Sequence, residues 1–197
     1  MAKKKSVYVK YMTPPFRASF PALHEPKLGP DGTGKPKYSV RMMFPKEAES
    51  KDKEMLAKIR ASVKDSALKY WDGKIPVNLK KPFKDGDTES DHDGDKGYMI
   101  ASARTDKKPG VVDARNIPIE SPEAIQEKIY PGCWCRATIL VGATETGGSK
   151  CVHFILQNLQ KLKDGERFDN RVAATEEFEP VEFSEEQEDF ADEKDGF

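Results

Sequence analysis

Apolar and polar residues alternate along several segments of this chain, as they do in half-buried β-strands. The segment 38–44 alternates throughout, and 16–20 does the same, with Phe16, Ala18 and Phe20 on its apolar side. Glycine and proline residues separate such segments, as turns require. Further strands are predicted at 98–104, 111–119, 135–141 and 151–159, and the last two form a hairpin that turns at 145–148.

The alternation gives way to a helical period between residues 51 and 71, where apolar residues recur every three or four positions. Ser50 is the predicted N-cap of this helix, and Gly73 is its stop. A short helix is predicted at 122–129, with Ser121 as its N-cap. One long helix, one short helix and about six strands indicate a β-rich α+β domain, small enough to be a closed or partly closed barrel.

The last 22 residues, 176–197, differ in composition from the rest of the chain. They contain eleven acidic residues, one lysine and four phenylalanines, one of which is the final residue. Residues 1–175 hold 32 basic and 23 acidic side chains, so a body of about +9 precedes a tail of about −10, although the whole chain has a net charge of −1. We expect one domain at 1–175 and a disordered acidic tail at 176–197. Opposed charges within one chain point to nucleic acid or to a charged partner.

Membrane insertion and export are not predicted for this sequence. No segment approaches the roughly 20 apolar residues that a membrane span needs. The N-terminal lysines have no apolar segment behind them, so they do not begin a signal peptide. Three cysteines, an odd number, fit reduced thiols in a cytosol.

The acidic segment 84–97 has the residue types of a calcium site without the required spacing. An EF-hand register that begins at Glu89 places Gly94 correctly at the sixth position. The same register puts Ile100 at the twelfth position, where a bidentate glutamate belongs. We therefore expect a solvated connection, with no metal and no other cofactor.

The cysteines and His153 do not form a predicted zinc site either. Zinc requires four ligand atoms about 2.0 to 2.3 Å from one point. A turn at 145–148 places Cys135 opposite Asn158, which lies five residues from His153 along the strand. The candidate ligands then lie toward opposite ends of the hairpin. No motif places a nucleophile beside a base, so we expect no enzyme.

Basic and aromatic residues on strand faces that the core does not use favour binding of single-stranded nucleic acid. Such binding combines a cationic groove along the phosphates with aromatic rings that stack on bases. Along 134–141, the inward set of small and aliphatic residues leaves Trp134 and Arg136 facing outward. The same alternation turns Arg17 and Arg41 outward. The candidate DNA-binding residues are Trp134, Arg136, Arg41, Arg17, Tyr38, Lys80, Lys81, Phe83, Lys84, Arg104, Lys107 and Lys108.

The chain also resembles a family of bacteriophage single-stranded DNA-binding proteins, over most of residues 13–171. The similarity lies in TPPFRASFPAL, in KYSVRMMFPK and above all in YPGCWCRATILVGATETGGSKCVHFILQNLQKLKDGERFDNR. Its most specific part is the strand Y-x-G-C-aromatic-x-R-A together with Q-K-x-x-D-G-E-R. The resemblance implies an oligonucleotide-binding (OB) barrel with a long inserted helix. It also implies a non-catalytic role in coating single strands during phage replication and recombination, in the cytoplasm of the host cell.

The acidic tail is similar to the tails of replicative phage single-strand binders. Tethered beside a cationic groove, it is expected to compete with DNA for that groove. Phe190 and Phe197 are its candidate contacts with replication or recombination proteins. Self-association of the chain into a homo-oligomer is also left open. Two other functions stay open: a metal-dependent nuclease or recombination accessory that uses the carboxylates of 85–95, and an interaction or scaffold protein whose tail binds basic partners.

Overall fold

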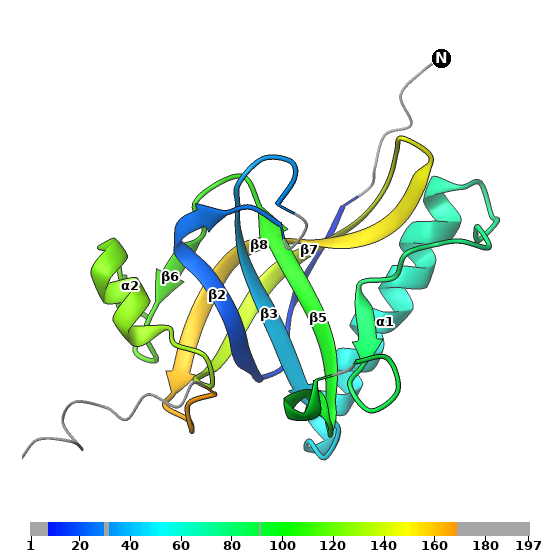
Figure 1. Ribbon diagram of the computed structural model, residues 1–197. Helices are drawn as coiled ribbons and strands as arrows, with labels where there is room; N and C mark the ends of the chain where they lie inside the picture. Colours follow the sequence, from blue (N-terminus) through cyan, green and yellow to red (C-terminus); the bar gives the residue numbers. More distant parts are fainter. Residues whose placement is uncertain (1–7, 30–31, 91, 169–197) are drawn as a thin grey trace, which may run out of the picture.

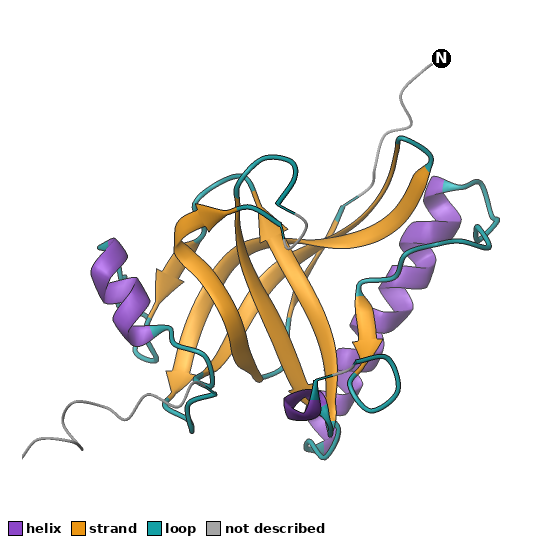
Figure 2. Ribbon diagram, viewed as in Figure 1, coloured by secondary structure: helices purple, strands orange, loops and turns teal. Residues whose placement is uncertain are grey.

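The computed structural model describes residues 8–29, 32–90 and 92–168 (Figures 1 and 2). These residues form strands and two α-helices, α1 (Ser50–Tyr70) and α2 (Pro122–Lys128), with a short 3-10 helix, η1 (Asp93–Asp95). The strands are β1 (Val9–Met12), β2 (Phe16–Lys27), β3 (Lys37–Pro45), β4 (Phe83–Asp85), β5 (Tyr98–Thr105), β6 (Gly110–Val112), β7 (Trp134–Thr146) and β8 (Ser149–Lys163). None of the helices described is both long enough and apolar enough to cross a membrane.

Five of the strands pair in a closed circuit. β2 pairs with β3, β3 with β5, β5 with β8, β8 with β7, and β7 again with β2. Within this circuit only β5 and β8 run parallel. β1 pairs with β7, β6 with β8 and β4 with β5. Figure 1 shows β2, β3 and β5 side by side across the front, with β7 and β8 crossing behind them. The chain is therefore β-rich, with its helices outside the strands.

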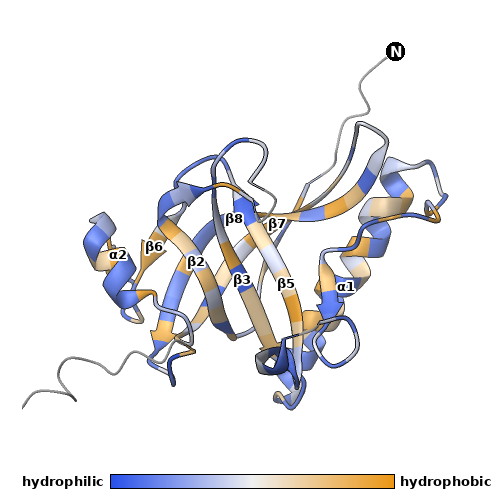
Figure 3. Cartoon of the chain, viewed as in Figure 1, coloured by the Kyte–Doolittle hydropathy of each residue, from blue (hydrophilic) through white to orange (hydrophobic). Residues whose placement is uncertain are grey.

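The circuit encloses the core, because alternate residues of its strands are apolar and point to the same side. Phe16, Val40, Met42, Ile139 and Phe154 are among the side chains buried there. The helix α1 packs against β7, and α2 packs against β2. They lie on opposite sides of the molecule in Figure 1, and both are mainly hydrophilic in Figure 3, as expected of helices that bury one face only.

The two helices form where the sequence predicts them, with one difference at an N-terminus. In α2, the Ser121 hydroxyl is the N-cap and accepts a hydrogen bond from the amide of Ala124 at 3.1 Å, as predicted. In α1, Ser50 is the first helical residue and Glu49 occupies the N-cap position, without a side-chain hydrogen bond. The prediction of Ser50 as N-cap was therefore wrong by one residue. Gly73 follows α1 at φ +83°, the left-handed conformation that ends many helices.

Two residues of the predicted strands face the opposite way from the prediction. Phe20 was expected in the core, but its side chain is 74% exposed and its backbone has φ +44°. A β-bulge interrupts the pairing of β2 with β3 between Ser19 and Ala22, and it breaks the alternation there. Met43 was expected to face outward, as Arg41 does, yet it is only 2% exposed.

The strand predicted at 111–119 is shorter in the structure. Only Gly110–Val112 is a strand, and the chain then turns. The Asp113 carboxylate accepts hydrogen bonds from the amides of Arg115 and Ile117, at 2.9 and 2.8 Å. Aspartate commonly closes turns with its own backbone in this way, and this competes with a strand.

The predicted hairpin forms, but with a different register. Its turn is Gly147-Gly148, with both residues at positive φ, so Thr146 faces Ser149. Cys135 faces Lys161 rather than the predicted Asn158. The tighter turn at Gly147-Gly148 shifts the pairing by two positions, and a β-bulge between Thr138 and Ile139 shifts it by one more. Within the described part of the chain, no three His, Cys, Asp or Glu side chains come together as a metal site would require.

Candidate nucleic-acid interface

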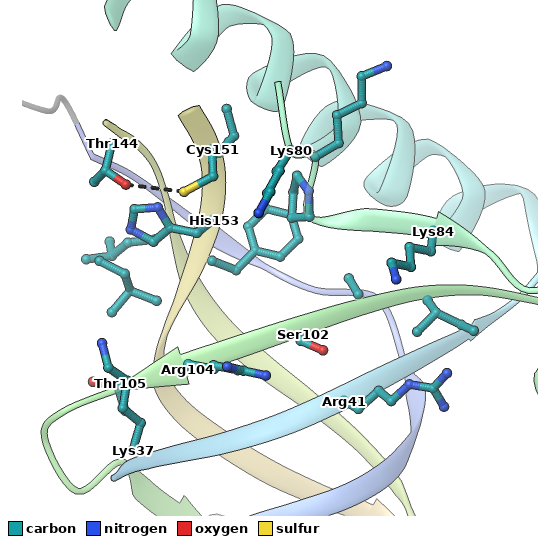
Figure 4. Close-up of a pocket in the computed structure, with 18 of the residues that line it drawn as sticks. Lys37, Arg41, Lys80, Lys84, Ser102, Arg104, Thr105, Thr144, Cys151 and His153 are labelled. Carbon is teal, nitrogen blue, oxygen red and sulfur yellow. Dashed lines mark hydrogen bonds between the residues drawn. The ribbon is translucent and has the colours of Figure 1, made fainter. Parts of the chain in front are cut away.

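A groove of about 1380 Å³ lies along the outer side of β5, β3 and the first half of β8. Figure 4 shows this groove, with Lys80 and Lys84 on one side and Arg41 and Arg104 on the strands opposite. Residues 80–84 form one wall. The groove is open and broad enough to follow an extended chain rather than to enclose a small molecule.

The alternation of β5 decides which side chains reach the groove. Ala101 and Ala103 are buried in the core, whereas Ser102 and Arg104 are exposed on the outer side. Arg104 is paired with Ser39 of β3, and Ser102 is paired with Arg41. Since directly paired residues share a face of a sheet, these four side chains lie together on the outer face.

The wall at 80–84 is held in place by β8 and by the core. The amide of Lys80 donates to the carbonyl of Lys150 at 2.9 Å, and the carbonyl of Lys80 accepts from the amide of Val152 at 3.0 Å. The ring of Phe83 packs edge-on against Phe154, with centroids 5.2 Å apart. The lysine side chains of this wall therefore stand on a fixed backbone beside the groove.

Positive charge predominates in the groove. Its acidic lining residues are Glu89 and Asp106, and Asp106 pairs with Lys37 at 3.3 Å. Five of its cationic side chains make no ion pair with any other residue that the structure describes. These are Lys80, Lys81, Lys84, Arg104 and Lys107. Unpaired cations along an open groove are what a polyanion such as a nucleic-acid backbone requires.

Arg41 also lines the groove, but its guanidinium is already paired. It donates to both carboxylate oxygens of Asp95, one of them at 2.8 Å, and Ser90 donates to the same carboxylate. The Asp95 side chain is 3% exposed. The hydrogen bonds from Arg41 hold the pKa of Asp95 below its ordinary value. Arg41 therefore fixes η1 across the end of β3 and has less positive charge to offer a ligand.

Three other carboxylates of 85–95, those of Asp85, Asp87 and Asp93, are likewise paired with cations. Lys46 donates to Asp85 at 2.5 Å and also to Asp87. These hydrogen bonds raise the pKa of Lys46 and lower the pKa of both carboxyl groups. Asp93 pairs with Lys96 at 2.7 Å. Ion pairs therefore fix parts of the segment 84–97, which was expected to be a solvated connection.

Two groove residues, Tyr8 and His153, were not among the predicted site residues. The ring of Tyr8 is 45% exposed and lies against Gly142, where an added Cβ would be 2.2 Å from the Tyr8 Cε1 atom. His153 is the strand partner of Gly142. Its buried Nδ1 atom has no hydrogen-bond partner among the described residues. Burial first, and the charge of Lys37 second, lower the pKa of His153, so its ring is neutral near pH 7.

A second group of cations and aromatics lies on β2, β7 and the end of β8, and we call it the Trp134 cluster: Arg17, Trp134, Lys163 and Phe168. The Arg17 guanidinium lies 5.5 Å from the Trp134 ring centroid and 4.6 Å from that of Phe168. It also donates to the carbonyl of Gly132 at 2.5 Å and to that of Glu166. Lys163 lies 5.3 Å from the same Trp134 ring. Arg17 thus joins the loop before β7 to the segment after β8.

The predicted site residues therefore divide between several places. Arg41, Lys80, Lys81, Lys84, Arg104 and Lys107 line the groove. Trp134 and Arg17 belong to the Trp134 cluster, and Arg136 donates to Gln160 at 2.8 Å. Tyr38 and Phe83 are half-buried on core-facing positions, and Lys108 donates to the carbonyl of Glu120 at 3.2 Å. Phe190 and Phe197 lie outside the described residues.

An alternating pattern at the N-terminus could have indicated Tyr8. In VYVKYM, Tyr8 and Lys10 fall on one side, and part of this segment becomes β1. His153 carries no such signal, because its place in the groove depends on the register of β8. Lys37 also lines the groove and immediately precedes the predicted strand at 38–44.

Comparison with known proteins places this chain among phage proteins. Its fold is similar to a single-stranded DNA-binding protein from bacteriophage Enc34 in complex with ssDNA, with TM-score 0.71 and 29% identity over 86% of this chain and 96% of that one. The same phage protein in a structure described without DNA gives TM-score 0.69 and 27% identity, over 91% and 97% of the two chains. The gp2.5 protein of bacteriophage T7, a single-stranded DNA-binding protein, has TM-score 0.55 at 16% identity over 88% and 99%, which is a likeness of fold.

A comparison with curated proteins finds no match. The family model described as the ssDNA-binding protein of Enterobacter phage Enc34 matches residues 9–191, which include most of the acidic tail. That match covers well over half of the sequence. The chain therefore belongs to the Enc34 single-stranded DNA-binding protein family.

Proposed function

We propose that this protein binds single-stranded DNA in the groove along β5, β3 and β8. The observation that carries the proposal is the set of five groove cations that have no ion-pair partner among the described residues. Each can neutralise a phosphate and release the counterion that was condensed on it. Family membership supports the same ligand, since the related Enc34 protein is described in complex with ssDNA.

We propose further that the closed circuit is an OB-fold barrel. In chain order its strands are β2, β3, β5, β7 and β8, and its parallel pair joins the third strand to the fifth. OB folds bind oligonucleotides on the face of their second and third strands, beside the loops that join strands one to two and four to five. β3 and β5 are the second and third strands of the circuit, and the groove lies on them.

Within the groove, we assign Tyr8 the part of a base-stacking ring. It is an aromatic side chain that is both exposed and among the groove residues. Gly142 supports it from below, because only a residue without a Cβ lets the ring lie so close to β7. Every base has a flat face, so stacking of this kind accepts any sequence.

The biological role that follows is the coating and protection of single strands during phage replication and recombination, in the cytoplasm of the infected cell and without catalysis. Three of the carboxylates of 85–95, those of Asp85, Asp87 and Asp95, already pair with Lys46 or Arg41, which favours binding over cleavage. The domain would be residues 1–175, and the tail 176–197 would compete with DNA for the groove. Phe190 and Phe197 would dock replication or recombination proteins. Deletion of 176–197 should then tighten DNA binding at low salt and have little effect at high salt.

Fluorescence anisotropy with a labelled oligo-dT tests the proposed function. If about five phosphates are contacted, log Kd should change with log salt with a slope of about 3.5, at roughly 0.7 per contact. The same labelled oligonucleotide, incubated with Mg²⁺, should stay intact. Binding that does not depend on salt, or no binding at all, would refute the proposal, and Mg²⁺-dependent cleavage would favour the nuclease alternative.

A further inference from the structure

Phe20 combines two features that a purely structural residue rarely shows. Its ring is 74% exposed, and its backbone adopts φ +44°, a left-handed conformation that is unusual for a bulky side chain. Both features are unfavourable in the free protein, since an apolar ring meets water and the backbone is strained. The alternation Phe16, Ala18, Phe20 would instead have buried the ring.

A β-bulge produces this arrangement. Ser19 pairs with Arg41 and Ala22 with Ser39, so two residues, Phe20 and Pro21, stand opposite Val40 alone. A bulge changes the direction in which a side chain points, and bulges are frequent beside functional sites. Val40 is fully buried in the core, whereas Phe20 is 74% exposed, so the bulge turns the Phe20 ring away from the core side that Val40 faces.

The groove approaches the same outer face. Ser39 and Arg41 are the β3 residues on either side of Val40, and their partners on β5 are Arg104 and Ser102. Arg41, Ser102 and Arg104 line the groove. Phe20 lies one strand further on, since β2 runs beside β3 and β3 beside β5 (Figure 1). A chain that crosses β5 and β3 from the groove therefore reaches β2 at Phe20.

The chemistry around Phe20 favours a nucleotide over an apolar protein surface. Its outer-face neighbours on β3 and β5 are serines and arginines, and Arg104 has no ion-pair partner among the described residues. A protein partner would require a continuous apolar patch. An exposed ring on β2 with the unpaired Arg104 two strands away on β5 is instead an arrangement suited to a single strand, with the base on the ring and the phosphate on the cation.

We propose that Phe20 is a base-stacking residue, which extends the path of single-stranded DNA from the groove across β3 onto β2. The inference rests on the proposed function, because it adds a contact to the same interface. With Tyr8 at the β7–β8 side, the bound strand then has one aromatic ring toward each end of its path.

Binding of oligo-dT to Phe20→Ala, Phe20→Leu and Phe20→Trp tests the proposal. Phe20→Ala should weaken binding by roughly five- to 150-fold, the usual loss for one stacked base, with an unchanged salt slope because no phosphate contact is lost. Phe20→Leu should weaken it nearly as much, since a leucine is apolar but has no ring. Phe20→Trp should bind within about threefold of the parent, because indole stacks at least as well. Val77→Ala is the matched control, as Val77 is 99% exposed and does not line the groove.

A second readout needs no variant. An oligonucleotide that carries 5-iodo-deoxyuridine, crosslinked to the unmodified full chain by light, should yield a peptide modified at Phe20. Equal affinities of the parent and Phe20→Ala, parent-like binding by Phe20→Leu, or crosslinks that never include Phe20 would overturn the stacking role. Failure of the parent itself to bind oligo-dT would refute the proposed function, so the two failures are distinguishable.

Discussion

The groove and the Trp134 cluster both place cations beside aromatic rings, yet they differ in what the cations already contact. In the groove, Lys84 and Arg104 have no ion-pair partner among the described residues. In the Trp134 cluster, Arg17 donates to two backbone carbonyls and lies between the rings of Trp134 and Phe168. The groove cations are available to phosphates, whereas Arg17 links the loop before β7 to the segment after β8.

This difference shows that an outward-facing arginine is not by itself a binding residue. Arg17, Arg41 and Arg104 all alternate outward on their strands, but only Arg104 lacks a partner in the described structure. Arg17 is committed to the loop before β7, and Arg41 to Asp95. Since a guanidinium offers a fixed set of donors, those already bound to the protein are not free to bind DNA.

The largest expected effect comes from removing three groove cations together. Lys80→Ala, Lys81→Ala and Arg104→Ala in one protein should weaken oligo-dT binding roughly a hundredfold at 0.1 M salt, and should lower the salt slope by about 2. Each cation contributes roughly 0.7 to that slope, and the contributions multiply in affinity. Anisotropy at several salt concentrations measures both quantities.

The matched control removes the same charge from α1. Lys53, Lys58 and Arg60 are exposed and do not line the groove. Their replacement by alanine should change affinity by less than about threefold, through the net charge alone. If both triple variants weakened binding equally, the protein would attract DNA through its total charge. The groove cations would then contribute no more to binding than other exposed cations.

A second prediction concerns the Trp134 cluster and uses Arg17→Ala. This change should lower the free energy of unfolding by about 1 to 3 kcal/mol, because two carbonyls lose their donor and two rings lose their cation. Oligo-dT affinity should change by less than about threefold. Urea unfolding and anisotropy measure the two effects. Arg136→Ala is the control: it removes a hydrogen bond to Gln160 and should change the free energy of unfolding by about 0.5 kcal/mol or less. A large loss of DNA affinity with an unchanged free energy of unfolding would show instead that the Trp134 cluster contacts DNA.

The smallest expected effect is a pH dependence that arises from His153. Burial and Lys37 lower the pKa of His153 in the free protein, so the ring is neutral at pH 7. A phosphate in the groove favours the charged ring and raises this pKa, so binding takes up a proton and affinity should increase as pH falls from 7.5 to 5.5. We expect a change of about threefold, which His153→Gln should abolish.

Besides Lys37 and its partner Asp106, the charged residues that line the groove with His153 include Lys80, Arg104 and Lys107. A pH dependence that persists in His153→Gln would exclude His153 as its source.

Much of the fold could be predicted from alternation alone. The segments 38–44, 98–104, 135–141 and 151–159 form strands, because their alternation leaves a largely apolar face to bury. The bulge at Phe20 could not be predicted, since an extra residue in one strand depends on the pairing of two strands. The same reason explains part of the register of β7 with β8, where a bulge between Thr138 and Ile139 shifts the partner of Cys135 by one residue.

The candidate site was predicted in part. The lysines at 80–84 and Lys107 were predicted from their clustering in the sequence, and they line the groove. Trp134 was placed outward, and it is half-buried beneath Arg17 and Lys163. The contacts of Arg17 with Trp134 and Gly132 join residues more than 100 positions apart, and no local pattern contains them.

Chemical footprinting of lysines tests most directly where DNA binds. The full chain, with and without saturating oligo-dT at about 0.2 M salt, where the tail is screened, is acetylated and each lysine is quantified by mass spectrometry. We expect DNA to slow the reaction of Lys80, Lys81, Lys84 and Lys107, and to leave Lys163 in the Trp134 cluster and Lys53 on α1 unchanged. Protection of Lys163 without protection of the groove lysines would contradict it.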